Sequence, residues 1–121
     1  GFPPETKIER AFPARLMPAD RIRKNKAIEF LARQQPLGWG NVYEAVLAAM
    51  EIPEVDTIYF LSDGVPSRGR YTTKTGILEN LAELNRFRRV MIHTVLTGEK
   101  GADESFMRDL AGITWGLTTK G

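Results

Sequence analysis

The sequence contains no cysteine and only one histidine, and this scarcity excludes several kinds of site. Without cysteine the chain has no disulfide, no thiolate metal ligand and no cysteine nucleophile. His93 alone provides no second imidazole for a zinc site. We interpret it as a hydrogen-bonded residue of a strand interior. A catalytic serine needs a nearby base, and no Gly-x-Ser-x-Gly motif occurs.

Long apolar runs and a strong charge imbalance are also missing. The longest apolar stretches, such as residues 45–50, are far too short to cross a bilayer. The 17 basic and 15 acidic side chains leave a net charge of +2. We interpret the basic stretches at residues 21–26 and 86–89 as solvated helix faces. We therefore expect neither a membrane span nor a nucleic-acid partner, and nothing in the sequence indicates a compartment.

The composition is that of an ordinary globular domain, with 121 residues, 42% hydrophobic and 26% charged. Residues 1–19 form a proline-rich lead-in, in which residues 6–12 are a candidate edge strand. The chain begins with Gly1 rather than Met, so we expect an internal cut or processing site there.

Residues 20–121 alternate between helical and strand patterns. Asp20 precedes a helix over 21–35, with Ile22, Ile28, Leu31 and Ala32 as its apolar residues. Asn41 is a candidate N-cap for a helix that ends before Pro53 and carries a buried stripe. The stripe is Val42, Ala45, Val46, Ala49 and Met50. Then follow a strand over 56–62, a helix over 74–88, a strand over 90–96, a helix capped by Asp103 and a strand over 115–119. This order predicts an α/β, Rossmann-like parallel sheet with helices on both faces.

The segment from Val55 to Gly69 is the most informative part of the chain. Its apolar run, residues 58–61, ends abruptly at Ser62-Asp63-Gly64. That pattern predicts a buried parallel strand followed by a carboxylate at its C-terminal end, the edge where open α/β sheets bind ligands. The alternative is that Asp63 and Gly64 only make the turn.

These elements resemble the von Willebrand factor A domain over roughly residues 20–119. Residues 55–69 are similar to that family's fourth strand and the Ser-Asp-Gly-x-Pro-Thr-x-Gly loop after it. Residues 36–49 resemble the preceding Gly-Gly-Thr-Asn loop and helix, and residues 92–98 the fifth strand. Residues 103–116 are similar to the last helix. The resemblance implies a doubly wound domain whose loops act in protein–protein recognition rather than catalysis.

The family also implies a metal-ion-dependent adhesion site built by three loops. Asp63 matches the aspartate of the third loop, whereas Gly40 stands where the second loop has threonine. The Asp-x-Ser-x-Ser motif of the first loop does not occur. Because Mg²⁺ takes about six oxygen ligands, we expect no cofactor in this chain as given. Upstream residues would have to complete a Mg²⁺ site, of which Asp63 is the remnant.

The resemblance further implies that the first strand of the family, which lies beside the fourth, is missing. The strand at residues 56–62 would then present an unpaired apolar edge, which is prone to association. Two partners would cover it: an upstream part of a longer polypeptide, which we favour, or a second copy of the chain.

Two functions remain in competition. The first is recognition of an unknown protein partner through a loop rim, made of Trp39, Asn41, Ser62, Arg68, Arg70 and Tyr71. For Trp39, packing over the next helix is the alternative. The second function is a hydrolase or phosphatase that uses Asp63, because Ser-Asp-Gly resembles the Asp-x-Asp-Gly motif of haloacid dehalogenase phosphatases. Leu61 stands at the position of their nucleophile, so we expect no enzyme.

Overall fold

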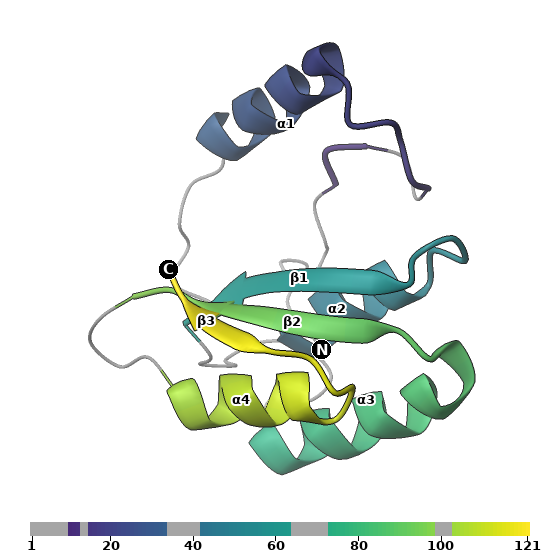
Figure 1. Ribbon diagram of the computed structural model, residues 1–121, viewed down its shortest axis with the longest axis vertical. Coiled ribbons are helices and arrows are strands. Elements are labelled where there is room, and N and C mark those ends of the chain that lie inside the picture. Colours follow the sequence, from purple (N-terminus) through teal and green to yellow (C-terminus); the bar gives the residue numbers. More distant parts are fainter. Residues whose placement is uncertain (1–9, 13–14, 34–41, 64–72, 99–102) are drawn as a thin grey trace, which may run out of the picture.

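The computed structural model describes residues 10–12, 15–33, 42–63, 73–98 and 103–121. Within these residues the elements are α1 (Arg21–Arg33), α2 (Val42–Met50), β1 (Thr57–Ser62), α3 (Lys74–Arg88), β2 (Met91–Leu96), α4 (Glu104–Gly112) and β3 (Thr118–Lys120). The strands form one parallel sheet in the order β1-β2-β3 (Figure 1). The predicted α/β, Rossmann-like fold is therefore confirmed.

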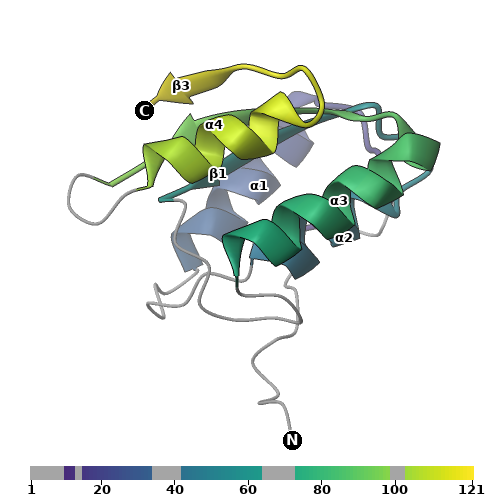
Figure 2. The ribbon, with the colours of Figure 1, turned by 90° about the horizontal axis from the view of Figure 1, so that it is seen from below.

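The helices α2, α3 and α4 pack on one face of this sheet, so the prediction of helices on both faces is wrong for the described residues. Their buried side chains form one core with β1 and β2, and Figure 2 shows them to the same side of the strands. The strand order explains why. The connection from β1 to β2 through α3 and that from β2 to β3 through α4 move in the same direction across the sheet. Because both connections have the same handedness, α3 and α4 lie on the same face.

The buried stripes of the helices agree well with the apolar periodicity of the sequence. Val42, Val46 and Met50 of α2 are buried, whereas Ala45 and Ala49 are half-buried. The periodic apolar residues of α3 and α4 also face the core, where Ile77, Leu81, Phe106, Leu110 and Ala111 are buried. The fully buried core side chains are Val42, Val46, Met50, Ile77, Leu81, Ile92, Phe106, Met107 and Leu110. A buried side chain of this size stabilises the fold by about 1.5–3 kcal/mol.

The strands are buried on one face only, and the prediction that β1 is excluded from water on both faces is wrong. Ile58 is buried, but Tyr59 and Leu61 are 69% and 63% exposed. In β2, buried Ile92 and Thr94 alternate with exposed Met91 and half-buried His93. The alternation follows from the one-sided cover of helices, because successive side chains of a strand point to opposite faces.

Helix α1 lies apart from the sheet, beyond its β1 side, in Figure 1. Asp20 precedes it and accepts a hydrogen bond from the Arg23 N–H at 2.8 Å, as expected of an N-cap. None of its side chains is buried, and its apolar residues Ile28 and Leu31 are exposed. Of the candidate edge strand over residues 6–12, residues 10–12 are described and are not in a strand, while residues 6–9 lie outside the described part. No described helix has the length and apolarity that a membrane crossing requires.

The last strand starts later than expected, at Thr118 rather than at residue 115. A turn over residues 113–115 occupies part of the intervening chain, with Trp115 at a φ of 66°. The Thr114 hydroxyl accepts a hydrogen bond from the Ile92 N–H at 2.7 Å. A Cβ on Gly116 would lie 1.7 Å from the Ile92 carbonyl oxygen, so only glycine fits there. The turn is therefore fixed against β2 before the chain enters β3.

One arginine joins α2, the α2–β1 connection and α3. The Arg88 guanidinium donates to the Met50 carbonyl at 2.5 Å and to the carbonyls of Ile52 and Val55 at 2.9 Å each. Two of these carbonyls belong to the chain after α2, where helical hydrogen bonds have ended. A cation also suits the negative end of a helix. Arg88 thereby fixes the entry of the chain into β1.

We predict that Arg88→Met lowers the free energy of unfolding by about 2–4 kcal/mol, because hydrogen bonds from charged donors contribute about 1.5–3 kcal/mol each and are not additive. Urea denaturation measures the change as a lower midpoint at an unchanged slope. The matched control is Arg86→Met, which removes only an exposed pair with Glu83 and should cost less than about 1 kcal/mol. Equal losses in the two variants would show that Arg88 does not have this role.

Candidate functional site at the C-terminal edge of the sheet

Asp63 lies directly after the C-terminal end of β1, at the edge where the parallel strands end. Ser62 stands opposite Leu96 in the register of β1 and β2, and the Thr97 N–H donates to the Ser62 carbonyl at 2.9 Å. The ladder thus continues to the last residue of β1. The Asp63 residue that follows is exposed, and it lies at the edge that binds ligands in open α/β sheets.

The backbone around Asp63 is held by the neighbouring connections. Its carbonyl accepts a hydrogen bond from the Asp103 N–H at 2.7 Å. Gly98, just past β2, has a φ of +84°, and a Cβ there would lie 3.6 Å from the Asp63 Cβ. Residues other than glycine rarely adopt this φ. The end of β1, the turn after β2 and the start of α4 therefore meet at Asp63.

Asp103 is the second carboxylate of this edge, and it has structural partners. Its side chain accepts a hydrogen bond from the Phe106 N–H at 2.9 Å, which makes it the N-cap of α4 as predicted. It also forms an ion pair with Lys74 at the start of α3. The bond to Lys74, followed by that to Phe106, holds the pKa of the Asp103 carboxyl below its ordinary value. Asp103 therefore joins the first turns of two helices.

The described residues of this edge do not make a complete metal site. Nowhere in the described part of the chain do three histidine, aspartate or glutamate side chains gather closely enough to hold a metal ion. Asp103 already binds Lys74 and caps α4, and Asp63 is an exposed carboxylate of this edge. A metal there would need oxygen ligands from outside the described residues. The role of Asp63 as a metal ligand stays a prediction.

The structure describes only part of the predicted rim. Ser62 is half-buried at the end of β1. Trp39, Asn41, Arg68, Arg70 and Tyr71 lie outside the described residues, as does Gly40. Their placement at the rim, and the role of Asn41 as an N-cap, therefore stay predictions.

Two residues of this edge were missed by sequence reasoning. Lys74 belongs to an ordinary helical pattern, and nothing in the sequence pairs it with Asp103, which lies 29 positions further along the chain. Gly98 offered a better signal, because a glycine directly after a predicted strand is a common mark of a positive φ.

His93 has the structural role expected of it. Its Nδ1 accepts a hydrogen bond from the Leu117 N–H at 3.1 Å, and its ring centroid lies 5.1 Å from that of Tyr59. Both contacts lie along the sheet rather than at the C-terminal edge.

A search of curated proteins found a weak similarity to the von Willebrand factor A domain-containing protein 3A of Homo sapiens. The two are 28% identical over 93 residues, which is 76% of this chain and 8% of that protein. The chain thus spans a small part of the relative. No family model and no solved structure matched. The similarity supports a relationship to von Willebrand factor A domains and agrees with the α/β fold.

We predict that Asp103→Ala lowers the free energy of unfolding by about 1 kcal/mol, the usual contribution of an N-cap side chain. Because the native pKa of Asp103 is lowered, its contribution is present above the unfolded pKa, whose reference value is 3.8. It disappears as the pH falls through the native pKa.

The measurement is chemical denaturation of both proteins at neutral pH and at several acidic pH values. The difference between wild type and variant should shrink in acid. Asp109→Ala, at an exposed acidic residue of the same helix, is the control and should change the free energy of unfolding by about 0.5 kcal/mol or less. A difference that stays constant down to the most acidic pH would contradict the assignment.

Proposed function

We infer that this chain is a protein–protein interaction module of the von Willebrand factor A type, which recognises its partner through the C-terminal edge of the sheet. The observation that carries the inference is Asp63, an exposed carboxylate on a backbone that Gly98 and Asp103 hold in place. The similarity to a von Willebrand factor A domain-containing protein supports the same function. A fixed and accessible edge suits recognition of a preformed partner surface.

The module is not an enzyme. The alternative, a hydrolase or phosphatase that uses Asp63, requires a second acid, base or nucleophile beside it. Asp103 is already paired with Lys74 and caps α4. Leu61, which stands two positions before Asp63, has no nucleophilic group. Among the described residues the edge therefore has no second group for such chemistry.

A metal ion would assist this recognition only if further residues complete its site. Asp63 would supply one oxygen ligand to Mg²⁺, and the ion would offer an open coordination position to an acidic group of the partner. The remaining ligands would come from upstream residues. For the chain as given, calorimetry should detect no micromolar Mg²⁺ binding, and a micromolar dissociation constant would contradict this.

Within the described residues no strand pairs with the outer edge of β1, and this edge offers a second route to partners. Asp56 and Ser62 accept hydrogen bonds from β2 and Thr97, and parallel ladders use alternate residues. Thr57, Tyr59 and Leu61 therefore turn their backbone groups away from β2. A strand from an upstream part of the polypeptide would pair there, and a second copy is the alternative. Light scattering that finds a folded monomer of the isolated chain would count against both partners.

The test of the rim is site-specific photo-crosslinking. A benzoylphenylalanine replaces Arg68 in one variant, and Arg108 on the outer side of α4 in the control. We expect a defined protein adduct from cells for position 68 only, and its loss when Asp63→Ala is added. Adducts of equal yield at both positions would contradict recognition through the rim.

The same protein serves to test the phosphatase alternative. Incubation with p-nitrophenyl phosphate and Mg²⁺ should release no nitrophenol above the background of an Asp63→Ala variant. Turnover that depends on Asp63 would overturn the inference and establish the alternative.

A further inference from the structure

A cavity opens at the opposite end of the strands, the N-terminal edge of the sheet. Its volume is about 520 Å³, within the range of about 300–1,000 Å³ that is common for ligand pockets. The starts of β1 and β2, the end of α3 and the turn after α4 form its walls. Its main lining residues are Asp56, Asn85, Arg86, Arg89, Met91 and Trp115. Ser62, the described residue of the predicted rim, lies at the other end of β1.

Arg89 is presented to this cavity on a rigid turn. Its φ is 53°, in the left-handed region where glycine is the usual residue after a helix. Its N–H donates to the Asn85 carbonyl at 2.9 Å. The Asn85 side chain accepts from the Val90 N–H at 2.8 Å and donates to the Val90 carbonyl at 3.0 Å. Both sides of Arg89 are thus fixed by Asn85.

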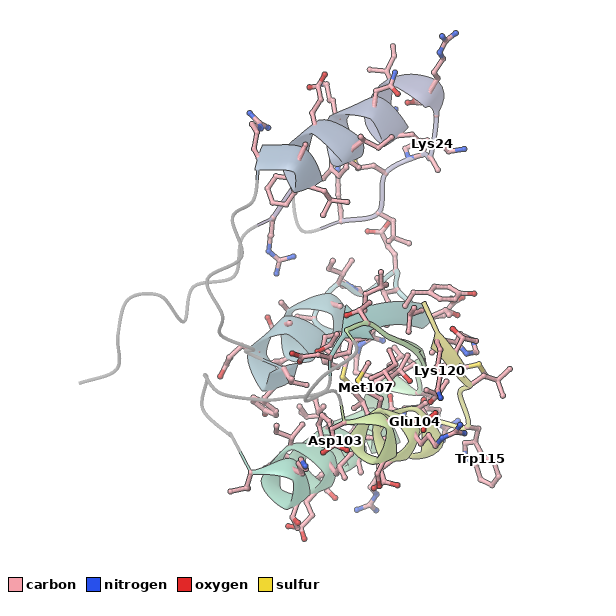
Figure 3. All side chains as sticks on the ribbon, turned by 90° about the vertical axis from the view of Figure 1, so that its left-hand side faces the viewer. Lys24, Asp103, Glu104, Met107, Trp115 and Lys120 are labelled. Atoms are coloured by element: carbon pink, nitrogen blue, oxygen red, sulfur yellow. The ribbon has the colours of Figure 1, made fainter. Side chains whose placement is uncertain are left out.

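Trp115 is held out of the core by an equally rigid turn. It is 89% exposed and has a φ of 66°, and Figure 3 shows it projecting from the body of the protein. The buried Thr114 hydroxyl donates to the Ala111 carbonyl at 3.0 Å. The Gly116 N–H donates to the same carbonyl at 2.9 Å. The indole therefore stays at the mouth of the cavity rather than folding onto the core.

Among the described residues that line the cavity, Arg89 is a cation for which no ion pair is found. Arg86 is paired with Glu83, and Asp56 accepts a hydrogen bond from the Thr57 hydroxyl at 3.0 Å. Within the described residues no carboxylate pairs with Arg89. Three of the last carbonyls of α4, those of Asp109, Ala111 and Gly112, would repel an anion, but they accept hydrogen bonds from the N–H groups of residues 113–116. An anionic group that enters the cavity would therefore form an ion pair with Arg89.

We propose that this cavity binds an acidic segment of a partner protein, with a carboxylate on Arg89 and an apolar side chain against Trp115 and Met91. Arginine and tryptophan are the residue types that dominate protein interfaces, and both are pre-organised here, which lowers the cost of binding. One unpaired arginine is too little for a nucleic-acid backbone, whose binding needs several cations. The apolar wall adds contacts that a free phosphate would not use.

The test is NMR titration of the ¹⁵N-labelled chain with a short synthetic peptide of alternating glutamate and leucine. The indole N–H signal of Trp115 is assigned by its loss in Trp115→Phe. We expect saturable shifts of this signal and of the Arg89 amide, and an affinity about tenfold lower in Arg89→Gln, which is common for a central interface residue. Arg33→Gln, which removes the same charge from α1, should leave the affinity unchanged.

Several outcomes would overturn the proposal. These are the absence of saturable shifts, equal shifts with a lysine–leucine peptide, inorganic phosphate or a single-stranded oligonucleotide, and unchanged affinity in Arg89→Gln. A retained wild-type pattern of backbone signals shows that each variant is folded. Loss of binding in Asp63→Ala but not in Arg89→Gln would place the peptide on the rim, and would contradict this proposal while leaving the proposed function intact.

Discussion

The arrangement of this protein depends on the way in which its two crossovers step across the sheet. From β1 to β2 and from β2 to β3 the chain moves in the same direction, so α3 and α4 share one face with α2. One face of the sheet is therefore buried and the other exposes Tyr59 and Leu61. The same parallel order collects all strand ends at one edge and all strand starts at the other.

The two edges differ in chemistry because different connections end there. The C-terminal edge carries two carboxylates. Asp103 pairs with Lys74 and caps α4, and Asp63 is exposed. The N-terminal edge carries the left-handed residues Arg89 and Trp115, each on a turn fixed by hydrogen bonds. A small domain with two rigid and chemically distinct ends is suited to connect partners, and this agrees with an interaction module.

The sequence predicted the positions of the helices and strands better than it predicted which of their faces are buried. The α3 boundaries, the Asp103 cap of α4 and the inner stripes of the helices follow from local signals, because caps and periodicity depend on residues a few positions apart. The burial of β1 was not predictable in this way. An apolar run looks the same whether one or both faces of its strand are covered, and only the strand order decides between them.

Contacts between residues far apart in the sequence could not be predicted, for a related reason. Arg88 belongs to a basic stretch that local patterns interpret as solvated, yet it bonds carbonyls more than 30 positions earlier in the chain. Trp115 lies in an apolar segment typical of a strand. The close contact of Gly116 with β2 places Trp115 in a turn instead. For the candidate site, the position of Asp63 was predictable from the end of its strand, whereas its neighbours Lys74 and Gly98 come from tertiary structure.

Disulfide trapping in this cysteine-free chain tests the parallel arrangement most directly. Cysteines at positions 61 and 95 stand opposite each other in the register of β1 and β2, and neighbouring strands about 4.7–4.9 Å apart lie within the Cα–Cα range of about 4.4–6.8 Å that a disulfide spans. A second variant has cysteines at positions 61 and 91, which would be neighbours only if β1 and β2 were antiparallel. Mild oxidation should close an intramolecular disulfide in the first variant and none in the second. The opposite result would contradict the account.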